Sequence, residues 1–213
     1  MDEVLDAVFA IECRSLPVDH AWALSSAIQA ALPWFAGEPQ AGLHTVHGAA
    51  SGSGWMRPEG EGAVLQLSRR TKLVLRLPES RLEDAAALTG RTLDIAGWPM
   101  RVGRLAARPL LRIASLFARS VIFEGAADES AFVAAAIEAL RALGVESSTM
   151  LCGREVTLAT PQRSYRTRSL MVTVATPAQS VELQRHGLGE ARKLGCGLFI
   201  PHKDVGDLRS GSD

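Results

Sequence analysis

The segment from residue 187 to 197 combines residue types that bind anions, with four glycines and two adjacent cations in eleven positions. Glycine can adopt a positive φ and lets a phosphate approach its N–H group, so this composition is typical of an anion-binding loop. A Walker phosphate loop is excluded, because Leu194 follows Lys193 where that motif requires Ser or Thr. A dinucleotide fingerprint is excluded as well, since a helix is predicted before the loop and an apolar run follows it. The residues that would hold the anion are Gly187, Gly189, Arg192, Lys193, Gly195 and Gly197.

The order of helix, glycine-rich basic loop and buried strand resembles the C-terminal part of the repeat-associated RNA-binding (RAMP) superfamily of CRISPR systems. The run from Gly187 to Lys203 is similar, more narrowly, to the myxan-type branch of the Cas6 family of repeat-processing endoribonucleases. Leu-Pro-Val-Asp-His-Ala-Trp-Ala-Leu at 16–24 and Leu-Val-Leu-Arg-Leu-Pro at 73–78 support this resemblance. It implies that the loop, together with His202 and Lys203, contacts RNA.

The resemblance implies an enzyme that cleaves precursor CRISPR RNA within its repeats, without a metal, to give mature guide RNAs. It also implies that the enzyme can stay on its product as a subunit of an effector complex. The expected partners are therefore repeat RNA, as a stem-loop, and other proteins of the complex. A non-catalytic RNA-binding subunit of such a complex is the alternative. A small-molecule enzyme is disfavoured, because no acidic pair or Ser-His-Asp arrangement stands out in the sequence.

Five histidines are candidates for proton transfer, because imidazole titrates closest to physiological pH. Attack by a ribose 2′-hydroxyl needs a base at that hydroxyl, an acid at the departing 5′-oxygen and positive charge near the phosphorus. His20 begins a predicted helix at the edge of its apolar stripe, where we expect it to face a cleft, and it matches a histidine that the resembled family places there. His44 or His47 could supply a second catalytic or phosphate-contacting group. His186 and His202 flank the glycine-rich segment and are either RNA contacts or surface residues.

A second basic segment surrounds Tyr165, which lies among Arg163, Arg166 and Arg168 in a predicted hairpin. A base can stack on the tyrosine while the guanidinium groups hold phosphates, as expected beside an RNA stem. In a strand, Arg166 and Arg168 would share one face. The alternative is a solvated hairpin with one amphipathic side chain.

The sequence predicts no metal site and no cofactor. His44 and His47 could share a face only in a helix, and the glycines and serines around them disfavour one. The cysteines, Cys13, Cys152 and Cys196, form no Cys-x-x-Cys pair, so neither a disulfide framework nor a zinc ribbon is indicated.

The elements that would position these residues fall into two similar halves. In the first half, apolar alternation from Leu5 to Ile11 predicts a strand, and an i, i+4 stripe from Leu24 to Leu32 predicts a helix that Pro33 ends. A loop rich in Gly and Ser is predicted at 44–62, strands at 63–67 and 72–77, a short helix at 79–88 and a hairpin at 97–99.

The second half repeats this order. Asp128 is predicted to cap a helix that Gly144 ends, and Thr176 with Gln179 predicts a capping box that starts a helix ending at Gly187. Strands are predicted at 113–123, 155–159, 169–175 and 198–200. Strand, helix, strand, strand, helix, strand, written twice, is an α+β plan of tandem ferredoxin-like (RRM-like) halves with antiparallel sheets. We expect the N-terminal half at 1–108 and the C-terminal half at 109–213, with the glycine-rich loop at 187–197.

Composition sets the outer limits of these expectations. A chain of 213 residues with 47% hydrophobic residues can form the core of one large domain or two small ones. Its formal net charge is +0, so RNA contacts are expected at local basic segments and not over the whole surface. The sequence shows no apolar run of about 18 residues and begins Met-Asp-Glu without a basic region, so we expect a cytoplasmic protein with no membrane contact.

Overall fold

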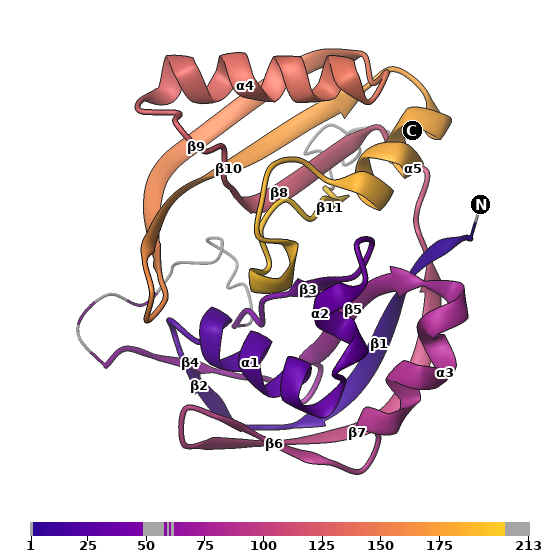
Figure 1. Ribbon diagram of the computed structural model, residues 1–213, viewed down its shortest axis with the longest axis vertical. Coiled ribbons are helices and arrows are strands. Elements are labelled where there is room, and N and C mark those ends of the chain that lie inside the picture. Colours follow the sequence, from indigo (N-terminus) through magenta and orange to yellow (C-terminus); the bar gives the residue numbers. More distant parts are fainter. Residues whose placement is uncertain (1, 49–57, 59, 61, 203–213) are drawn as a thin grey trace, which may run out of the picture. The chain divides into compact units, whose positions relative to one another are not determined.

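The computed structural model describes residues 2–48, 58, 60 and 62–202 (Figure 1). The chain divides into two compact units. The first comprises residues 1–109 together with 158–164 and 192–195, and the second comprises 110–157, 165–191 and 196–213. The short segment 192–195 carries the two cations of the glycine-rich loop, so these cations belong to the first unit.

The first unit is built on a five-stranded antiparallel sheet of order β3-β5-β1-β7-β6. Side chains alternate along its central strand, so that Leu5, Ala7 and Phe9 enter the core while Asp6 lies on the opposite face. The strands are β1 (Val4–Glu12), β3 (Gly42–His44), β5 (Lys72–Pro78), β6 (Thr92–Ile95) and β7 (Trp98–Pro109).

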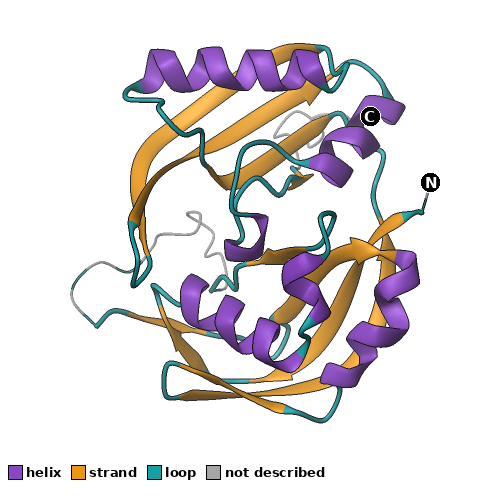
Figure 2. Ribbon diagram, in the orientation of Figure 1, coloured by secondary structure: helices purple, strands orange, loops and turns teal. Residues whose placement is uncertain are grey.

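Helices cover the core side of this sheet (Figure 2). Leu24 and Ile28 of the first helix join Phe9 and Leu75 of the sheet in one apolar cluster, as the i, i+4 stripe predicts. A separate two-stranded sheet pairs the segment before this helix with residues 64–66. The remaining elements of the unit are α1 (Ala21–Ala31), α2 (Trp34–Gly37), η1 (Glu79–Arg81), α3 (Leu82–Ala85), η2 (Ala86–Leu88), β2 (Ser15–Pro17) and β4 (Val64–Gln66).

The second unit has a four-stranded sheet of order β11-β8-β10-β9 and two helices. The Asp128 side chain accepts a hydrogen bond from the N–H of Ala131, and Thr176 accepts one from the N–H of Gln179, so both predicted N-caps are confirmed. The return bond of the predicted capping box is not made, because the Gln179 side chain donates to the carbonyl of Gly144. Phe132 of the longer helix packs with the sheet in a second apolar cluster. The elements are β8 (Ser115–Val121), α4 (Glu129–Ala142), β9 (Ser147–Ala159), β10 (Ser164–Val174), α5 (Pro177–His186) and β11 (Ile200–Pro201).

Several predicted elements are wrong in detail. The second strand of the first unit is β3, which ends where the predicted loop begins, whereas residues 64–66 pair with β2 and lie outside the main sheet. The predicted helix at 79–88 is a short α-helix between two 3-10 turns. Residues 164–168, predicted to lie in the loop of the basic hairpin, belong to β10, and the last strand begins at Ile200.

Each unit nevertheless follows the predicted order of strand, helix, strand, strand, helix, strand. In both sheets the first strand lies between the third and the fourth, with the second beside the third, as β7-β1-β5-β3 and β11-β8-β10-β9 show. This order confirms the tandem ferredoxin-like α+β fold. Among the described residues, no helix is long and apolar enough to cross a membrane.

Candidate active site

Four polar side chains meet on the face of the first unit's sheet that lies opposite its helices. Asp6 on β1 stands in register with Arg76 on β5 and Arg108 on β7, so the three side chains share this face. Arg76 donates from Nε and Nη2 to the two carboxylate oxygens of Asp6, at 2.9 and 3.3 Å. Arg108 donates from Nη2 to Asp6 Oδ2 at 3.2 Å. The fourth member is His44, at the end of β3.

The carboxylate of Asp6 is held in its ionised form. Burial alone would raise the pKa of this carboxyl, but the neighbouring His44 and the charge of Arg76 outweigh it and hold the pKa well below its usual range. The side chains of Asp6 and Arg76 expose only 7% and 0% of their surface, so this is a buried ion pair. It fixes a negative charge beside the imidazole of His44.

His44 lies against this carboxylate without a full hydrogen bond. Its Nε2 is 3.6 Å from Asp6 Oδ1, and it has no hydrogen-bond partner among the residues that the structure describes. Burial lowers the pKa of His44, the guanidinium groups of Arg76 and Arg108 add to this, and Asp6 opposes it. The imidazole is therefore neutral at neutral pH, with 16% of its side chain exposed.

His20 does not lie at the edge of a cleft, so that expectation is wrong. The residue is 3% exposed, and both ring nitrogens bond to the backbone. The N–H of Val46 donates to Nε2 at 3.0 Å, which leaves Nδ1 to donate to the carbonyl of Pro17 at 2.8 Å. His20 thus holds the segment directly after His44. Its catalytic role stays a prediction, and its geometry is that of a positioning residue.

His47 lies beyond β3 and is only partly buried. Its Nε2 is 3.0 Å from the hydroxyl oxygen of Thr45, with either atom able to donate. Strand β3 ends at His44, so these two histidines do not share one regular element. Of the three predicted catalytic histidines, His44 is the one whose ring faces the charged cluster.

The two cationic residues of the glycine-rich segment lie in a 3-10 turn, η3 (Arg192–Leu194). Their side chains donate hydrogen bonds to the loop before β3. Arg192 donates from Nη2 to the carbonyl of Gln40 at 3.1 Å. Lys193 donates from Nζ to the carbonyls of Glu38 and Ala41. Burial lowers the pKa of Lys193 to about 8 and that of Arg192 to about 10, and in each case a neighbouring arginine adds to the effect.

The glycines of this segment serve close backbone packing. Gly195 has φ +87°, and a Cβ there would lie 2.7 Å from Thr45 Cγ2 and 3.0 Å from the Leu43 carbonyl, on either side of His44 in the sequence. At Gly189 and Gly197, where φ is +72° and +70°, a Cβ would collide with a backbone carbonyl. Gly187, with φ +66°, ends α5.

Three of these glycines have N–H groups that are not open for a phosphate. Those of Gly187, Gly195 and Gly197 donate to the carbonyls of Leu183, Arg192 and Ser120. The expectation of a backbone anion cradle is therefore wrong at these positions, because backbone carbonyls already use the donors. Whether RNA contacts the loop through its side chains stays a prediction.

The basic hairpin carries two of its arginines, Arg166 and Arg168, in strand β10 of the second unit. Arg166 and Arg168 share a face, as predicted, and both reach Glu155 on β9. Arg166 makes a bidentate pair with this carboxylate at 2.9 and 2.8 Å. Arg168 also donates to the carbonyl of Gly153 at 3.2 Å. Tyr165 is partly buried and lies on the opposite face of β10.

The other predicted contacts are scattered. Arg163 is exposed at the turn between β9 and β10, in the segment that belongs to the first unit. His202 is exposed, with its ring 5.7 Å from that of Phe117. His186 pairs with Glu182 at 3.2 Å. Lys203 lies outside the described residues.

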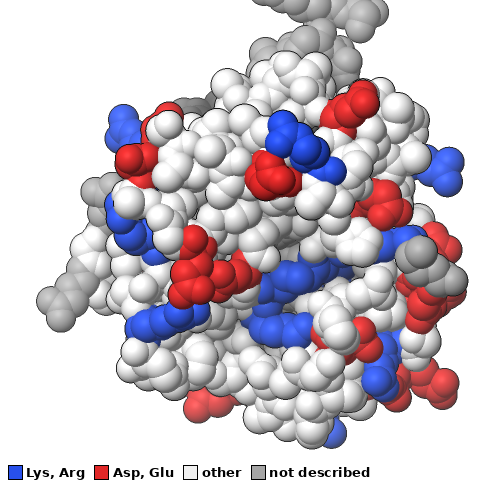
Figure 3. Space-filling model, turned by 45° about the horizontal axis from the view of Figure 1, so that its top comes forward, with Lys and Arg blue, Asp and Glu red and all other residues white. Residues whose placement is uncertain are grey.

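The wider charge distribution is mixed. On the face drawn in Figure 3, acidic and basic side chains lie side by side, in keeping with a formal net charge of +0. Within the described part of the chain, no three His, Cys, Asp or Glu side chains gather as a metal-binding group.

The sequence interpretation missed Asp6, Arg76 and Arg108 as site residues. A signal was present, because Asp6 and Arg76 each interrupt an apolar strand pattern, and such interruptions need a partner when the strand is buried. Their pairing could not be read without the register of β1 against β5 and β7.

Solved structures place the fold in a known class. "CRISPR associated protein Cas6" has a TM-score of 0.63 at 11% identity, covering 94% of this chain and 100% of that one. "An RAMP protein binding different RNA substrates" has a TM-score of 0.61 at 13% identity, covering 92% and 98%. A Cas6-related protein from Pyrococcus furiosus has a TM-score of 0.58 at 11% identity, covering 92% and 97%. The fold is therefore that of the RAMP proteins.

Sequence comparison narrows this class to a family. The family model Cas6 Crispr matches residues 5–204. The CRISPR-associated endonuclease Cas6 of Myxococcus xanthus is 32% identical over 197 residues, which cover 92% of this chain and 81% of that protein. The chain belongs to the Cas6 family.

Proposed function

We propose that this protein is an endoribonuclease that cleaves precursor CRISPR RNA within its repeats to give mature guide RNAs. Family membership supports the reaction class, since the Myxococcus xanthus relative is named an endonuclease. The structural observation that carries the proposal is the position of His44, a largely buried neutral imidazole beside the carboxylate of Asp6 and near the guanidinium groups of Arg76 and Arg108.

In the proposed reaction, the 2′-oxygen of the nucleotide upstream of the cut attacks the adjacent phosphorus, and the bond from phosphorus to the 5′-oxygen breaks. With Nε2–H of His44 directed at Asp6, Nδ1 accepts the proton of the 2′-hydroxyl, and the carboxylate stabilises the imidazolium that forms. The upstream product ends in a 2′,3′-cyclic phosphate and the downstream product in a 5′-hydroxyl. None of these steps routes through a metal.

Lys193 supplies positive charge and a proton in this proposal. Two of the three N–H donors of its ammonium go to the carbonyls of Glu38 and Ala41, and the third is left for a phosphate oxygen. A pKa of about 8 leaves the group mostly protonated at neutral pH, yet acidic enough to pass a proton to the departing 5′-oxygen. The packing of Gly195 against Leu43 and Thr45 keeps η3 next to β3.

The repeat RNA is the proposed partner, and the basic hairpin is its proposed contact on the second unit. The pair of Glu155 with Arg166 is exposed, so an RNA phosphate can take the place of the carboxylate. Tyr165 is proposed to stack on a base. Retention of the product RNA within an effector complex is a further part of this proposal.

A second candidate is a non-catalytic RNA-binding subunit of a CRISPR complex. The observation that favours it is that both ring nitrogens of His20 already bond to the backbone, so neither is left to transfer a proton. The two candidates differ in one measurable property, which is the cleavage of RNA.

The test is incubation of purified protein with its repeat RNA in EDTA, beside the same RNA with a 2′-deoxy sugar just upstream of the cut. We expect cleavage of the first RNA to a 2′,3′-cyclic phosphate product and no cleavage of the second, because the attacking oxygen is missing. Loss of activity in EDTA, or cleavage of the deoxy RNA, would overturn the mechanism. Tight binding without cleavage of either RNA would favour the non-catalytic subunit.

A further inference from the structure

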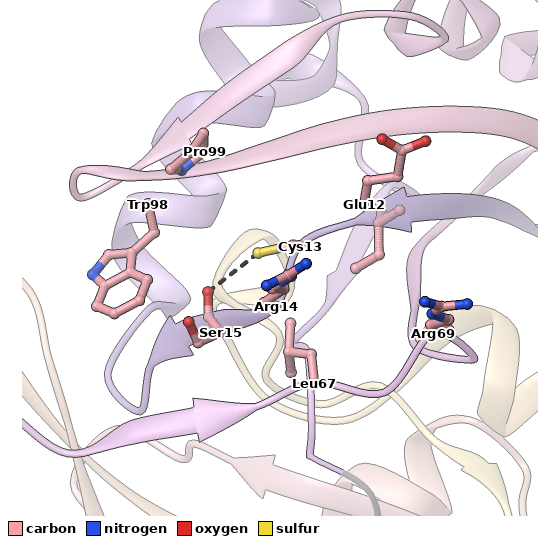
Figure 4. Close-up of a pocket in the computed structure, with 9 residues that line it drawn as sticks. Glu12, Cys13, Arg14, Ser15, Leu67, Arg69, Trp98 and Pro99 are labelled. Carbon is pink, nitrogen blue, oxygen red and sulfur yellow. Dashed lines mark hydrogen bonds between the residues drawn. The ribbon is translucent and has the colours of Figure 1, made fainter.

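A pocket opens on the first unit, away from the residues of the candidate active site (Figure 4). It lies between the connection from β1 to β2, the turn after β4 and the start of β7. Its volume is ≈ 770 Å³, within the range of roughly 300–1,000 Å³ typical of ligand sites. Its walls are fixed by hydrogen bonds, since the N–H of Leu67 donates to the Arg14 carbonyl at 2.8 Å and the Cys13 thiol donates to the Ser15 carbonyl at 3.2 Å.

The floor of this pocket is apolar. Ile11, Cys13, Leu67 and Trp98 are all partly buried and pack on the hydrophobic core of the first unit. The register of β1 against β7 shifts between Phe9 and Ile11, a bulge of the kind that re-aims side chains next to binding sites. The indole of Trp98 therefore has one part held by the core and another part facing the pocket.

The rim of the pocket carries two exposed cations, Arg14 and Arg69. Neither side chain makes a hydrogen bond or ion pair with any residue that the structure describes. In Figure 4, Trp98 and Arg69 lie on opposite sides of the pocket, with the guanidinium of Arg14 between them. This contrasts with Arg76 and Arg166, each of which is paired with a carboxylate.

An aromatic platform beside exposed guanidinium groups is the arrangement that binds single-stranded nucleic acid, with a base on the ring and phosphates on the cations. We propose that this pocket binds one nucleotide of a single-stranded segment of RNA, stacked on Trp98 and held through its phosphates by Arg14 and Arg69. Glu12, also on the rim, offers an acceptor for an amino group of the base. The inference rests on the proposed function in that the occupant is a segment of the RNA substrate.

The test is binding of a short single-stranded oligoadenylate RNA to the full chain at several salt concentrations. The variant Arg14→Ala/Arg69→Ala should bind several-fold more weakly at low salt. Its slope of log affinity against log salt should fall by roughly 0.7 for each phosphate that an arginine no longer binds. The matched control, Arg70→Ala/Arg104→Ala, removes two exposed arginines that do not line the pocket, and it should bind as the parent does. Equal affinity and slope in the two double variants would overturn the proposal.

Base stacking is tested separately by Trp98→Leu, which keeps an apolar side chain against the core. This variant should bind the oligoadenylate roughly fivefold more weakly or worse. It should also lose part of the RNA-induced quenching of tryptophan fluorescence, with a thermal melt confirming the fold. Parental affinity and quenching would exclude Trp98 as the platform. The proposal would also be contradicted if the pocket bound acidic peptides while the two double variants bound RNA with equal affinity.

These outcomes are separable from those of the cleavage experiment. If the parent chain fails to cleave repeat RNA but Arg14→Ala/Arg69→Ala still binds oligoadenylate more weakly than its control, the pocket stands and the proposed enzyme activity fails. If the parent cleaves repeat RNA and the two double variants bind alike, the activity stands and the pocket fails.

Discussion

Two carboxylate–guanidinium pairs in this molecule share one chemistry in opposite surroundings. In the first unit, the side chains of Asp6 and Arg76 expose 7% and 0% of their surface. In the second unit, those of Glu155 and Arg166 expose 34% and 56%. Both pairs are bidentate, with N–O distances of 2.9 and 3.3 Å in the buried pair and 2.9 and 2.8 Å in the exposed one.

The difference between them is access to water. Breaking the buried pair leaves a charge that nothing solvates, so Asp6 and Arg76 are part of the framework that orients His44. The exposed pair is worth little to stability and can exchange its carboxylate for a phosphate. In the proposed function, a similar pattern of arginine and acid orients the catalytic histidine in one unit and offers a contact for RNA in the other.

The largest expected effect breaks the buried pair. Asp6→Asn should lower the free energy of unfolding by about 3–5 kcal/mol, because it leaves Arg76 buried without its counter-ion. The matched control, Glu155→Gln, should leave the free energy of unfolding close to that of the parent, because water replaces the missing partner. Urea titrations measure both. Similar losses in the two variants would remove the distinction between framework and surface.

A smaller effect is expected at His20, which holds the segment after His44. His20→Ala should cost about 1–3 kcal/mol of unfolding free energy, since the buried N–H of Val46 loses its acceptor, and cleavage should slow with it. His20→Gln places an amide near the same partners and should recover much of both losses. If His20→Ala is as stable as the parent yet inactive, and Gln does not rescue it, then His20 acts in the chemistry itself.

On the exposed side, Arg166→Ala/Arg168→Ala should weaken binding of repeat RNA at low salt. The slope of log affinity against log salt should fall by roughly 0.9 for each phosphate of a duplex-like stem that the variant no longer binds. Arg141→Ala, an exposed arginine paired with Glu138 on α4, is the control. Unchanged affinity and slope in the double variant would move the RNA surface away from this hairpin.

The smallest effect is a pH dependence of stability. Because the pKa of His44 in the folded chain lies below its ordinary value of 6.5, the folded imidazole stays neutral while the unfolded one takes up a proton as the pH falls. Its stabilising contribution is therefore full above about pH 6.5 and is lost below it. Urea titrations between pH 8 and pH 5 should show a shallower decline for His44→Gln than for the parent. Parallel curves would mean that His44 is not held neutral by the fold.

Local sequence signals predicted much of the fold. The capping side chains of Asp128 and Thr176 each accept a hydrogen bond from the N–H three residues further along the chain, so the sequence alone reveals them. Strand β3 escaped prediction because it has only three residues, directly before a segment rich in Gly and Ser, and its pairing with β5 decides its conformation. The same holds for β4, whose apolar pattern suits either the main sheet or the pairing with β2 that it makes.

The candidate site was predictable in its residue types and not in its geometry. His44 stood out as a titratable residue, but its carboxylate partner lies 38 positions earlier in the chain, across two strand pairings. Lys193 and the glycines stood out as an anion loop, whereas long-range packing sets their actual contacts with Glu38, Ala41 and Thr45. Composition shows which donors and cations a segment carries. Only the fold shows which of them are already bonded to backbone carbonyls.

The most direct measurement of the central claim is single-turnover cleavage of repeat RNA in EDTA by His44→Ala, with His47→Ala as the control. His44→Ala should cleave roughly a hundredfold more slowly or worse, the usual scale for loss of a general acid or base, while its affinity for the RNA stays close to that of the parent. His47→Ala should keep most of the parental rate. Parental cleavage by His44→Ala would contradict the assignment and return the chemistry to His20 or His47.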